Sequence, residues 1–209
     1  AGISLKSIAT GQSVSVKDSG TTLVVKSESF DDASNELVLE QYFTMFFRGV
    51  NGGQSTGDPH DTGLDLADYS ATVAQGEDSN RFLASVQAHM DGDQTMRYAQ
   101  ASGDFMPIHI NDEFAKSVGL GGIIIHGLCT MAHASWAAIE KLCDSDPTRL
   151  ARIAVRFSKP LRPGDDLRTS IFKSDSQPRV PDCDLNYLLS QRVSDGEVIL
   201  TNSLVEVHK

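Results

Sequence analysis

The chain has 209 residues, of which 40% are hydrophobic, and its formal net charge is −10. This length and apolar content are sufficient to bury the core of one large domain or two small ones, and they exclude a disordered protein. The acidic balance argues against nucleic acid as a partner, because phosphate recognition requires clustered lysine and arginine side chains. It does not exclude an anionic metabolite, which needs only a local basic patch.

The hydropathy and the cysteine pattern indicate a cytoplasmic protein. No run of about 18 apolar residues occurs, so no membrane span is expected, and residues 1–10 lack the basic flank and cleavage pattern of a signal peptide. Cys129, Cys143 and Cys183 are odd in number, far apart and form no CxxC pair, which is typical of a reduced compartment. The histidines show no zinc-ligand spacing, so no metal site is expected.

The first fifty residues predict an antiparallel sheet without a helix. Strand-like segments occupy 12–16, 21–27 and 36–48, and turn residues such as Gly20 and Asn35 separate them. We therefore expect a meander of three strands.

Residues 51–80 differ in composition from the rest of the chain. Gly, Ser, Asp and Thr dominate, and the apolar periodicity is lost, which predicts a polar linker. The G-x-S-x-G pattern at 53–57 matches a hydrolase nucleophile motif, but that motif requires a helix to begin at the serine. Because Pro59 follows in a turn-like segment, we interpret the match as chance.

The second half predicts an α+β layered architecture. Short helices are expected at 95–101 and 112–118, and a long helix at 126–143, which is apolar nearly all round and so should be buried under a sheet. Strand-like segments then follow in a row. They cover 151–157, 166–173, 186–193 and 197–207.

Asp104 and His109 are the first candidates for chemistry. On a continuous helix, five residues would place them about 140° apart. Gly103 and Pro107 break such a helix, and a turn here can bring both side chains to one point. A carboxylate and an imidazole that share a water molecule suit acid–base catalysis near neutral pH. Alternatively, Asp104 caps a turn and His109 is a strand residue with satisfied hydrogen bonds.

His126 and Gly127 lie at the start of the long predicted helix. The first N–H groups of a helix have no partner within it and carry partial positive charge, so Gly127 can polarise a thioester carbonyl. Alternatively, Gly127 is required only for packing. The nearby glycines form no phosphate-binding loop, which argues against a nucleotide site.

Residues 98–109 resemble the signature of MaoC-like (R)-specific enoyl-CoA hydratases, Y-x-x-x-S-G-D-x-N-P-[hydrophobic]-H. Further matching segments follow in the same order at 125–128 and 157–165, and the resemblance spans about 95–207. Met106 departs from the pattern, since the family usually has Asn there, and this departure puts the geometry of the loop in question.

The resemblance implies a hot-dog fold, in which an antiparallel sheet wraps a long helix. It implies that Asp104 and His109 activate water, that the Gly127 N–H is the oxyanion donor, and that trans-2-enoyl thioesters are reversibly hydrated to (R)-3-hydroxyacyl thioesters without a cofactor. The substrate is acyl-CoA or an acyl-carrier thioester. The substrate-binding residues implied are Tyr98, Ser102, Phe105, Met106, Ile108, His126, Leu128, Lys159 and Arg162.

The resemblance also suggests three regions. Residues 1–50 are similar to the last strands of a preceding, incomplete hot-dog repeat, 51–80 form the linker, and 81–209 form the catalytic domain. Because the first sheet would lack its helix, we expect another subunit, in a homodimer, or an acyl chain to cover it. Two other functions stay open: a hot-dog thioesterase, and a non-catalytic acyl-CoA-binding or partner subunit.

Overall fold

The computed structural model describes residues 2 and 4–209. The chain forms two compact units, Ala1–Thr62 and Gly63–Lys209. The division falls inside the segment for which a linker was predicted, and the second unit includes residues 63–80 as well as the predicted catalytic region.

The first unit is an antiparallel sheet of three strands, as the sequence predicts. The order is β1 (Leu5–Lys17), β2 (Gly20–Asp31) and β3 (Leu37–Arg48). Each strand pairs with the next through a short turn. No helix is found in this unit among the residues described, and β3 exposes many of its apolar side chains.

The second unit contains an antiparallel sheet of five strands with the order β4-β6-β7-β8-β5. The four strands predicted in this half are confirmed, whereas β4 was not predicted. The strands are β4 (Phe82–His89), β5 (Leu150–Phe157), β6 (Asp166–Lys173), β7 (Cys183–Arg192) and β8 (Val198–His208).

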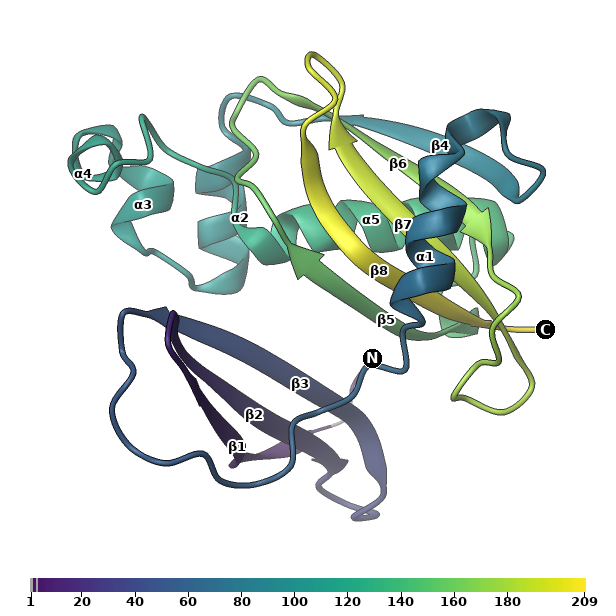
Figure 1. The fold of residues 1–209 in the computed structure, drawn as a ribbon, viewed down its shortest axis with the longest axis horizontal. Coiled ribbons are helices and arrows are strands. Elements are labelled where there is room, and N and C mark those ends of the chain that lie inside the picture. Colours follow the sequence, from purple (N-terminus) through teal and green to yellow (C-terminus); the bar gives the residue numbers. More distant parts are fainter. Residues whose placement is uncertain (1, 3) are drawn as a thin grey trace. The chain divides into compact units, whose positions relative to one another are not determined.

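The long helix α5 (Gly127–Leu142) lies along one face of this sheet (Figure 1). Its Ala134 and Ala138 pack against Leu188 and Val205 in a common core cluster. This arrangement confirms the predicted hot-dog fold. The expectation that α5 is buried on all sides is wrong, because the sheet covers only one face and Trp136 on the other remains 48% exposed.

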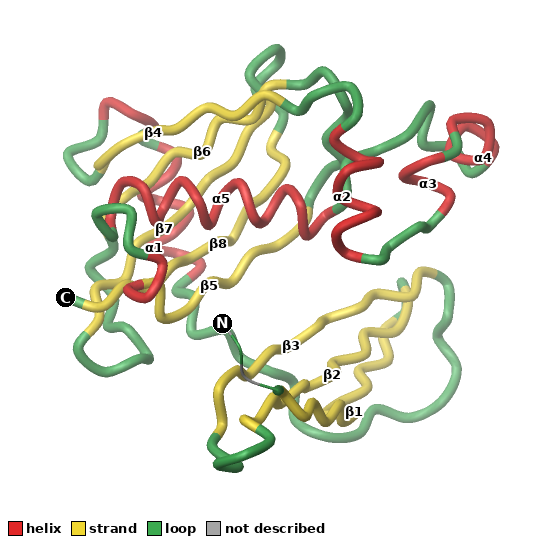
Figure 2. The backbone as a smooth tube through the Cα atoms, turned by 180° about the vertical axis from the view of Figure 1, so that it is seen from behind, coloured by secondary structure: helices red, strands yellow, loops and turns green. Residues whose placement is uncertain are grey.

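A second helix, α1 (Leu66–Ala74), covers the opposite face of the same sheet (Figure 2). Successive strand residues point to opposite faces; Tyr187 accordingly joins Tyr69 of α1, whereas Leu188 joins α5. The Tyr69 hydroxyl donates to the Leu188 carbonyl oxygen at 3.1 Å. The predicted linker is therefore wrong in its second half, where α1 and the 3₁₀ turn Gly76–Asp78 are packed elements.

Three short helices follow β4 and lead to the start of α5. They are α2 (Gln94–Ser102), α3 (Pro107–Ile110) and α4 (Asp112–Ser117). The first and last confirm the predicted helices, and α3 was not predicted. A further 3₁₀ turn, Pro147–Arg149, precedes β5. No described helix has the length and apolar character that crossing a membrane would require.

The G-x-S-x-G segment of the first unit forms no nucleophile turn. Thr56 pairs with Val14 in an isolated bridge, and the Val16 N–H donates to the Ser55 hydroxyl oxygen at 2.9 Å. No helix begins there. The interpretation of this motif as chance is confirmed.

Candidate active site

The C-terminal end of α2 fixes the start of the candidate site. Gly103 terminates the helix in the left-handed conformation, with φ of 78°, which a residue with a side chain rarely adopts. The Ser102 hydroxyl donates to the Tyr98 carbonyl oxygen at 2.8 Å and accepts the Asp104 N–H at 3.2 Å. Both interactions are with nearby residues of the chain, so the Ser102 side chain stabilises the shape of the loop.

The loop after Gly103 folds back through hydrogen bonds of the main chain. Asp104 Oδ1 accepts the Met106 N–H at 3.1 Å, and the Met106 carbonyl oxygen accepts the His109 N–H at 3.0 Å. Pro107 opens α3 at a position where its missing N–H costs nothing. The Met106 side chain is 55% exposed, so its backbone, and not its side chain, forms the turn. Met106 in place of Asn thus leaves a well-formed loop.

His109 is buried and held from one side. Its Nδ1 lies 2.8 Å from the Ile124 carbonyl oxygen, which can only accept, so Nδ1 carries the hydrogen and Nε2 keeps a lone pair. Burial lowers the pKa of His109 from its ordinary value of 6.5; the Ile124 carbonyl opposes this shift, and nearby His126 adds to it. The ring is therefore unprotonated near neutral pH, with Nε2 available as a base.

His126 lies directly before α5 and contacts His109, Asp104 and Tyr98. Its ring stacks on that of His109 with centroids 3.8 Å apart and planes 20° apart. On its edge, Nε2 donates to the Asp104 carbonyl oxygen at 3.0 Å. The Tyr98 ring lies 4.8 Å away between centroids.

The fold thus brings three chemical groups together at the start of α5. Asp104, His109 and His126 each offer one atom able to bind a metal ion, a carboxylate oxygen or a ring nitrogen, and these three atoms lie within 4.8 Å of one another. Gly127, the next residue, is exposed, and its N–H belongs to the unpaired first turn of the helix. A Cβ built on Gly127 would lie 3.3 Å from the Phe157 ring, so a side chain there would require this ring to shift.

The remaining predicted residues lie around the site in different ways. Phe105 and Leu128 expose about half of their side chains, and the Ile108 carbonyl accepts the Ile124 N–H at 3.2 Å. Lys159 is exposed, with Nζ 4.0 Å from Glu197.

Arg162 contacts the loop that precedes α5. Its guanidinium donates to the Leu120 carbonyl oxygen and lies against Gly121 and Gly122, and its N–H donates to Asp165 at 2.8 Å. The guanidinium and the backbone N–H of Arg162 thus each have a partner within the second unit.

An apolar groove of about 490 Å³ adjoins the site along the exposed face of α5. Tyr98 lines both this groove and the ring cluster. The sequence analysis missed the groove, although the spacing of Cys129, His133 and Trp136 places them on one helical face. The lining residues are Gln87, Ala88, Gln94, Tyr98, Cys129, Ala132, His133 and Trp136.

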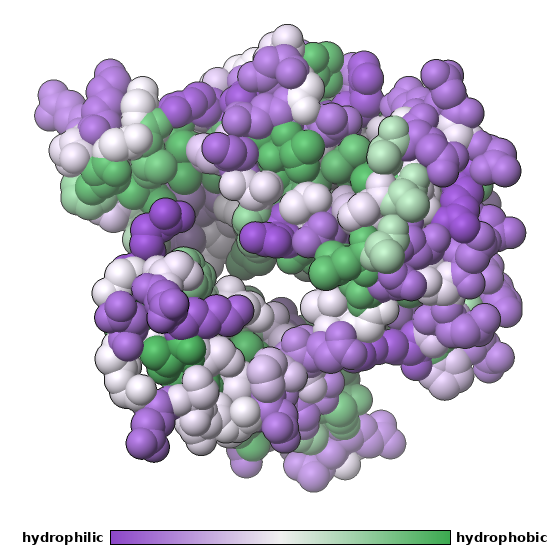
Figure 3. Space-filling model, viewed as in Figure 1, coloured by the Kyte–Doolittle hydropathy of each residue, from purple (hydrophilic) through white to green (hydrophobic). Residues whose placement is uncertain are grey.

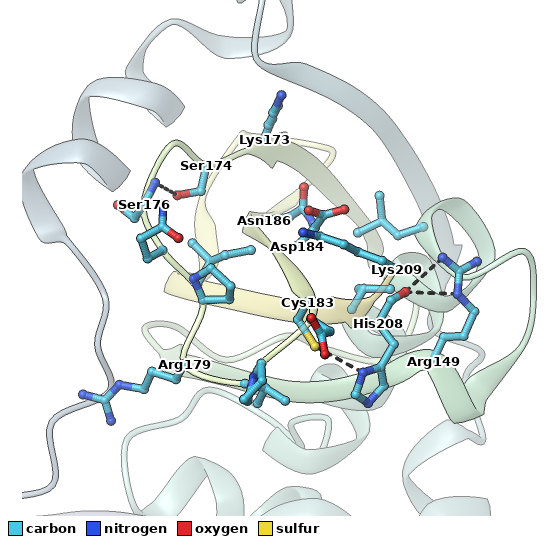
Figure 4. Close-up of a pocket in the computed structure, with 18 of the residues that line it drawn as sticks. Arg149, Lys173, Ser174, Ser176, Arg179, Cys183, Asp184, Asn186, His208 and Lys209 are labelled. Carbon is cyan, nitrogen blue, oxygen red and sulfur yellow. Dashed lines mark hydrogen bonds between the residues drawn. The ribbon is translucent and has the colours of Figure 1, made fainter.

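A cavity of about 830 Å³ lies at the other end of α5 (Figure 4). Leu142 of α5 lines it, together with the chain from Lys173 to Asn186, where Cys183 approaches His208 at 3.4 Å. Since α5 has 16 residues, its two ends are about 24 Å apart. None of the predicted site residues lines this cavity, so it is separate from the ring cluster.

Apolar side chains also gather on the surface over α3 and α4, at the left of the space-filling view (Figure 3). Met106, Phe114 and Val118 expose large parts of their side chains in this part of the chain. The same stretch of chain thus provides both the polar loop of the site and an apolar surface.

Comparison with known proteins agrees with the fold. The family model described as MaoC like domain matches residues 74–182. The chain therefore belongs to the MaoC-like domain family.

Two relatives illustrate the match in sequence. The chain is 31% identical over 192 residues to "Probable enoyl-CoA hydratase 2" of Dictyostelium discoideum, covering 90% of the chain and 62% of that protein. It is 30% identical to "Enoyl-CoA hydratase 2, peroxisomal" of Arabidopsis thaliana, covering 75% and 50% respectively. The chain thus spans about half to three-fifths of the length of these relatives.

Solved structures agree over nearly the whole chain. The MaoC-like dehydratase of Phytophthora capsici has a TM-score of 0.80 at 25% identity, covering 98% of this chain and 64% of that one. The full-length peroxisomal multifunctional enzyme type 2 of Drosophila melanogaster has a TM-score of 0.77 at 27% identity, covering 97% and 33%.

Proposed function

We propose that this chain is a lyase that reversibly hydrates trans-2-enoyl thioesters to (R)-3-hydroxyacyl thioesters. The observation that carries the proposal is the convergence of the Asp104 carboxylate and the His109 imidazole at the start of α5, beside the N–H of Gly127. The names of the two hydratase relatives support the same reaction class.

The chemistry follows from the hydrogen bonds around each group. Asp104 and His109 hold one water molecule, and the lone pair on His109 Nε2 takes a proton from it as its oxygen bonds to C3. The electron pair of the C2=C3 bond moves toward the thioester oxygen, where the Gly127 N–H stabilises the developing enolate. The proton that His109 Nε2 took from the water is then transferred to C2, which restores the neutral imidazole. Because one water supplies both hydroxyl and proton from one side, the addition is syn.

The groove beside Tyr98 suits the apolar part of the substrate. It begins at the ring cluster and is largely apolar, so an acyl chain bound there would leave the thioester near Gly127. The substrate would be acyl-CoA or an acyl-carrier thioester, in a cytoplasmic protein. Two of the relatives named above are described as peroxisomal, which makes localisation of the tagged protein a direct test.

The test is a panel of enoyl-CoA substrates of different chain lengths, followed by loss of enoyl absorbance, with chiral analysis of the product. Formation of the (R)-3-hydroxyacyl thioester supports the proposal. Release of free CoA from a saturated acyl-CoA would instead identify a thioesterase, and binding of enoyl-CoA without turnover would identify a non-catalytic subunit.

The reaction as proposed requires neither a metal nor a redox cofactor. The two histidines each bond one ring nitrogen to a backbone carbonyl oxygen, which fixes the orientation of both rings. Metal-bound histidines show the same arrangement, so the need for a metal is tested directly. We expect protein treated with a chelator and then desalted to keep its full rate of hydration. A loss of rate that added divalent metal restores would contradict this part of the proposal.

We further propose that the chain forms a homodimer in which a second subunit covers the exposed apolar side of β3. Phe43, Met45 and Phe47 alternate along that strand, each about 40–44% exposed. Light scattering should give twice the mass of the chain, and Phe43→Ser should shift the protein toward monomer. A strictly monomeric wild-type protein at working concentrations would contradict cover by a second subunit.

A further inference from the structure

His126 contacts three parts of the site at once. Its Nε2 holds the backbone of Asp104, its ring face lies on His109, and its main chain leads directly into Gly127. Its carbonyl oxygen also accepts the N–H of Thr130, the first backbone bond of the α5 turn, at 3.1 Å. No other residue named in the site contacts all three of these parts.

The two ring nitrogen atoms of His126 differ in their hydrogen bonding. The side chain is 2% exposed, and Nδ1 is a buried atom without a hydrogen-bond partner among the residues described. An unpaired buried acceptor is unfavourable, so an apolar ring of similar size would pack better if packing were the only requirement. The compensating interaction is at Nε2, which donates to the Asp104 carbonyl oxygen.

This hydrogen bond joins parts of the chain that are distant in sequence. Asp104 lies in the loop after α2, 22 residues before His126. The same loop is otherwise held by local bonds, in which the Asp104 N–H donates to the Ser102 hydroxyl oxygen and the Met106 N–H donates to Asp104 Oδ1. The local bonds set the shape of the loop, whereas the bond from His126 sets its position relative to α5.

We propose that His126 is a positioning residue, whose bond to the Asp104 carbonyl oxygen holds the acid loop in register with His109 and Gly127. The inference rests on the proposed hydratase function and deepens it. It replaces the substrate-binding role that the sequence resemblance implied for His126. A misplacement of about 1 Å in a reacting group can lower turnover about 100-fold, so such a residue affects rate more than binding.

The test compares His126→Gln with His126→Asn. The glutamine amide nitrogen reaches about as far as histidine Nε2, whereas that of asparagine is too short to reach the Asp104 carbonyl oxygen. We expect kcat of His126→Gln to stay within about fivefold of wild type and that of His126→Asn to fall about 100-fold, with KM changed less than about threefold in both. His89→Asn, an exposed histidine paired with Asp166, serves as control and should keep its kcat.

A third variant separates the hydrogen bond from the stack. His126→Phe keeps a ring on His109 but has no donor, so its kcat should fall as that of His126→Asn does. An active Phe variant, or a Gln variant as slow as the Asn variant, would overturn the proposal. If the Phe variant does not fold, the Gln and Asn pair decides alone.

Hydrogen exchange gives a readout that does not depend on turnover. The Asp104 and Met106 amides bond within the loop, and they should exchange faster in His126→Asn than in His126→Gln. Equal exchange in both variants would contradict the positioning role. If wild-type protein hydrates no enoyl thioester, the proposed function fails, whereas the exchange result still tests the role of His126.

Discussion

The two sheets of the molecule differ in how their faces are covered. In the second unit, α5 and α1 lie on opposite faces, so β7 and β8 are buried over most of their length. In the first unit, the structure describes no helix, and β3 is exposed over nearly all of its length. The comparison shows that strand formation alone does not build a core, because a sheet must pack against another layer to bury its apolar side chains.

The candidate site lies entirely in the second unit, whose sheet is covered on both faces. Its three converging groups, Asp104, His109 and His126, all belong to the second unit, at the end of its covering helix. A helix start against a packed sheet holds its N–H groups at a fixed place, which catalysis by charge stabilisation requires. In the first unit, β1 and β3 are largely exposed and β2 is buried or half-buried, without a comparable cluster of buried ionisable side chains among the residues described.

The largest expected effect concerns the acid–base pair. Asp104→Asn and His109→Ala should each lower turnover about 10²- to 10⁴-fold, because each removes one of the groups that we propose as acid and base. Circular dichroism should show that both variants keep the fold, since Asp104 is exposed and asparagine can still accept the Met106 N–H. His89→Ala is the matched control for His109→Ala. Wild-type rates in either site variant would place the chemistry elsewhere.

The next largest effect is expected in stability, where the loss of one tyrosine from each unit can be compared. Tyr69→Ala should lower the free energy of unfolding by about 3–5 kcal/mol, because it empties a site between α1 and the sheet. Tyr42→Ala on β3, which stacks on His60 near the surface, should cost less than about 1 kcal/mol. Urea titration followed by circular dichroism measures both. Equal losses would mean that the first unit has a core of similar strength.

A smaller effect is expected in the pH dependence. A base acts only when it is unprotonated, and burial lowers the pKa of His109 from 6.5. The rate should therefore be lost only as pH falls below 6.5, through the lowered pKa, and the acid limb of kcat/KM reports it. Burial makes the largest contribution and lowers this pKa. The hydrogen bond to the Ile124 carbonyl raises it, the nearby His126 lowers it further, and Asp104 raises it. An acid limb above pH 6.5 would contradict a buried, unprotonated base.

The smallest effect is expected for Met106→Asn, which restores the residue usual in the family signature. Since the backbone of Met106 makes the hydrogen bonds of the turn and its side chain is exposed, turnover should change less than about threefold. A rise of about 100-fold would show that the asparagine side chain contributes directly to the chemistry.

Sequence patterns predicted the elements that local interactions define. The strand β6 and the helix α5 follow their apolar periodicity, and Gly103 with Pro107 correctly indicated that the chain turns between Asp104 and His109. What the sequence did not reveal depends on distant partners. The helix α1 lies in a polar context, and Tyr69 is buried because it packs against distant strand residues such as Tyr187, while its hydroxyl donates to the carbonyl oxygen of Leu188, 119 residues later.

The contact of His126 with Asp104 has the same non-local character. It spans 22 residues, and nothing in the immediate sequence of either residue indicates it. The groove along α5 is a related case, since the all-round apolar pattern of the helix predicted burial and concealed a face that the sheet does not cover.

The turn at Asp104 makes its two carboxylate oxygens unequal. Oδ1 closes a small ring with the Met106 N–H, so the carboxylate shapes the backbone with one oxygen and offers the other to solvent and substrate. One more methylene, as in glutamate, would enlarge this ring. The turn therefore depends on the length of the aspartate side chain, whereas the proposed reaction depends on its charge.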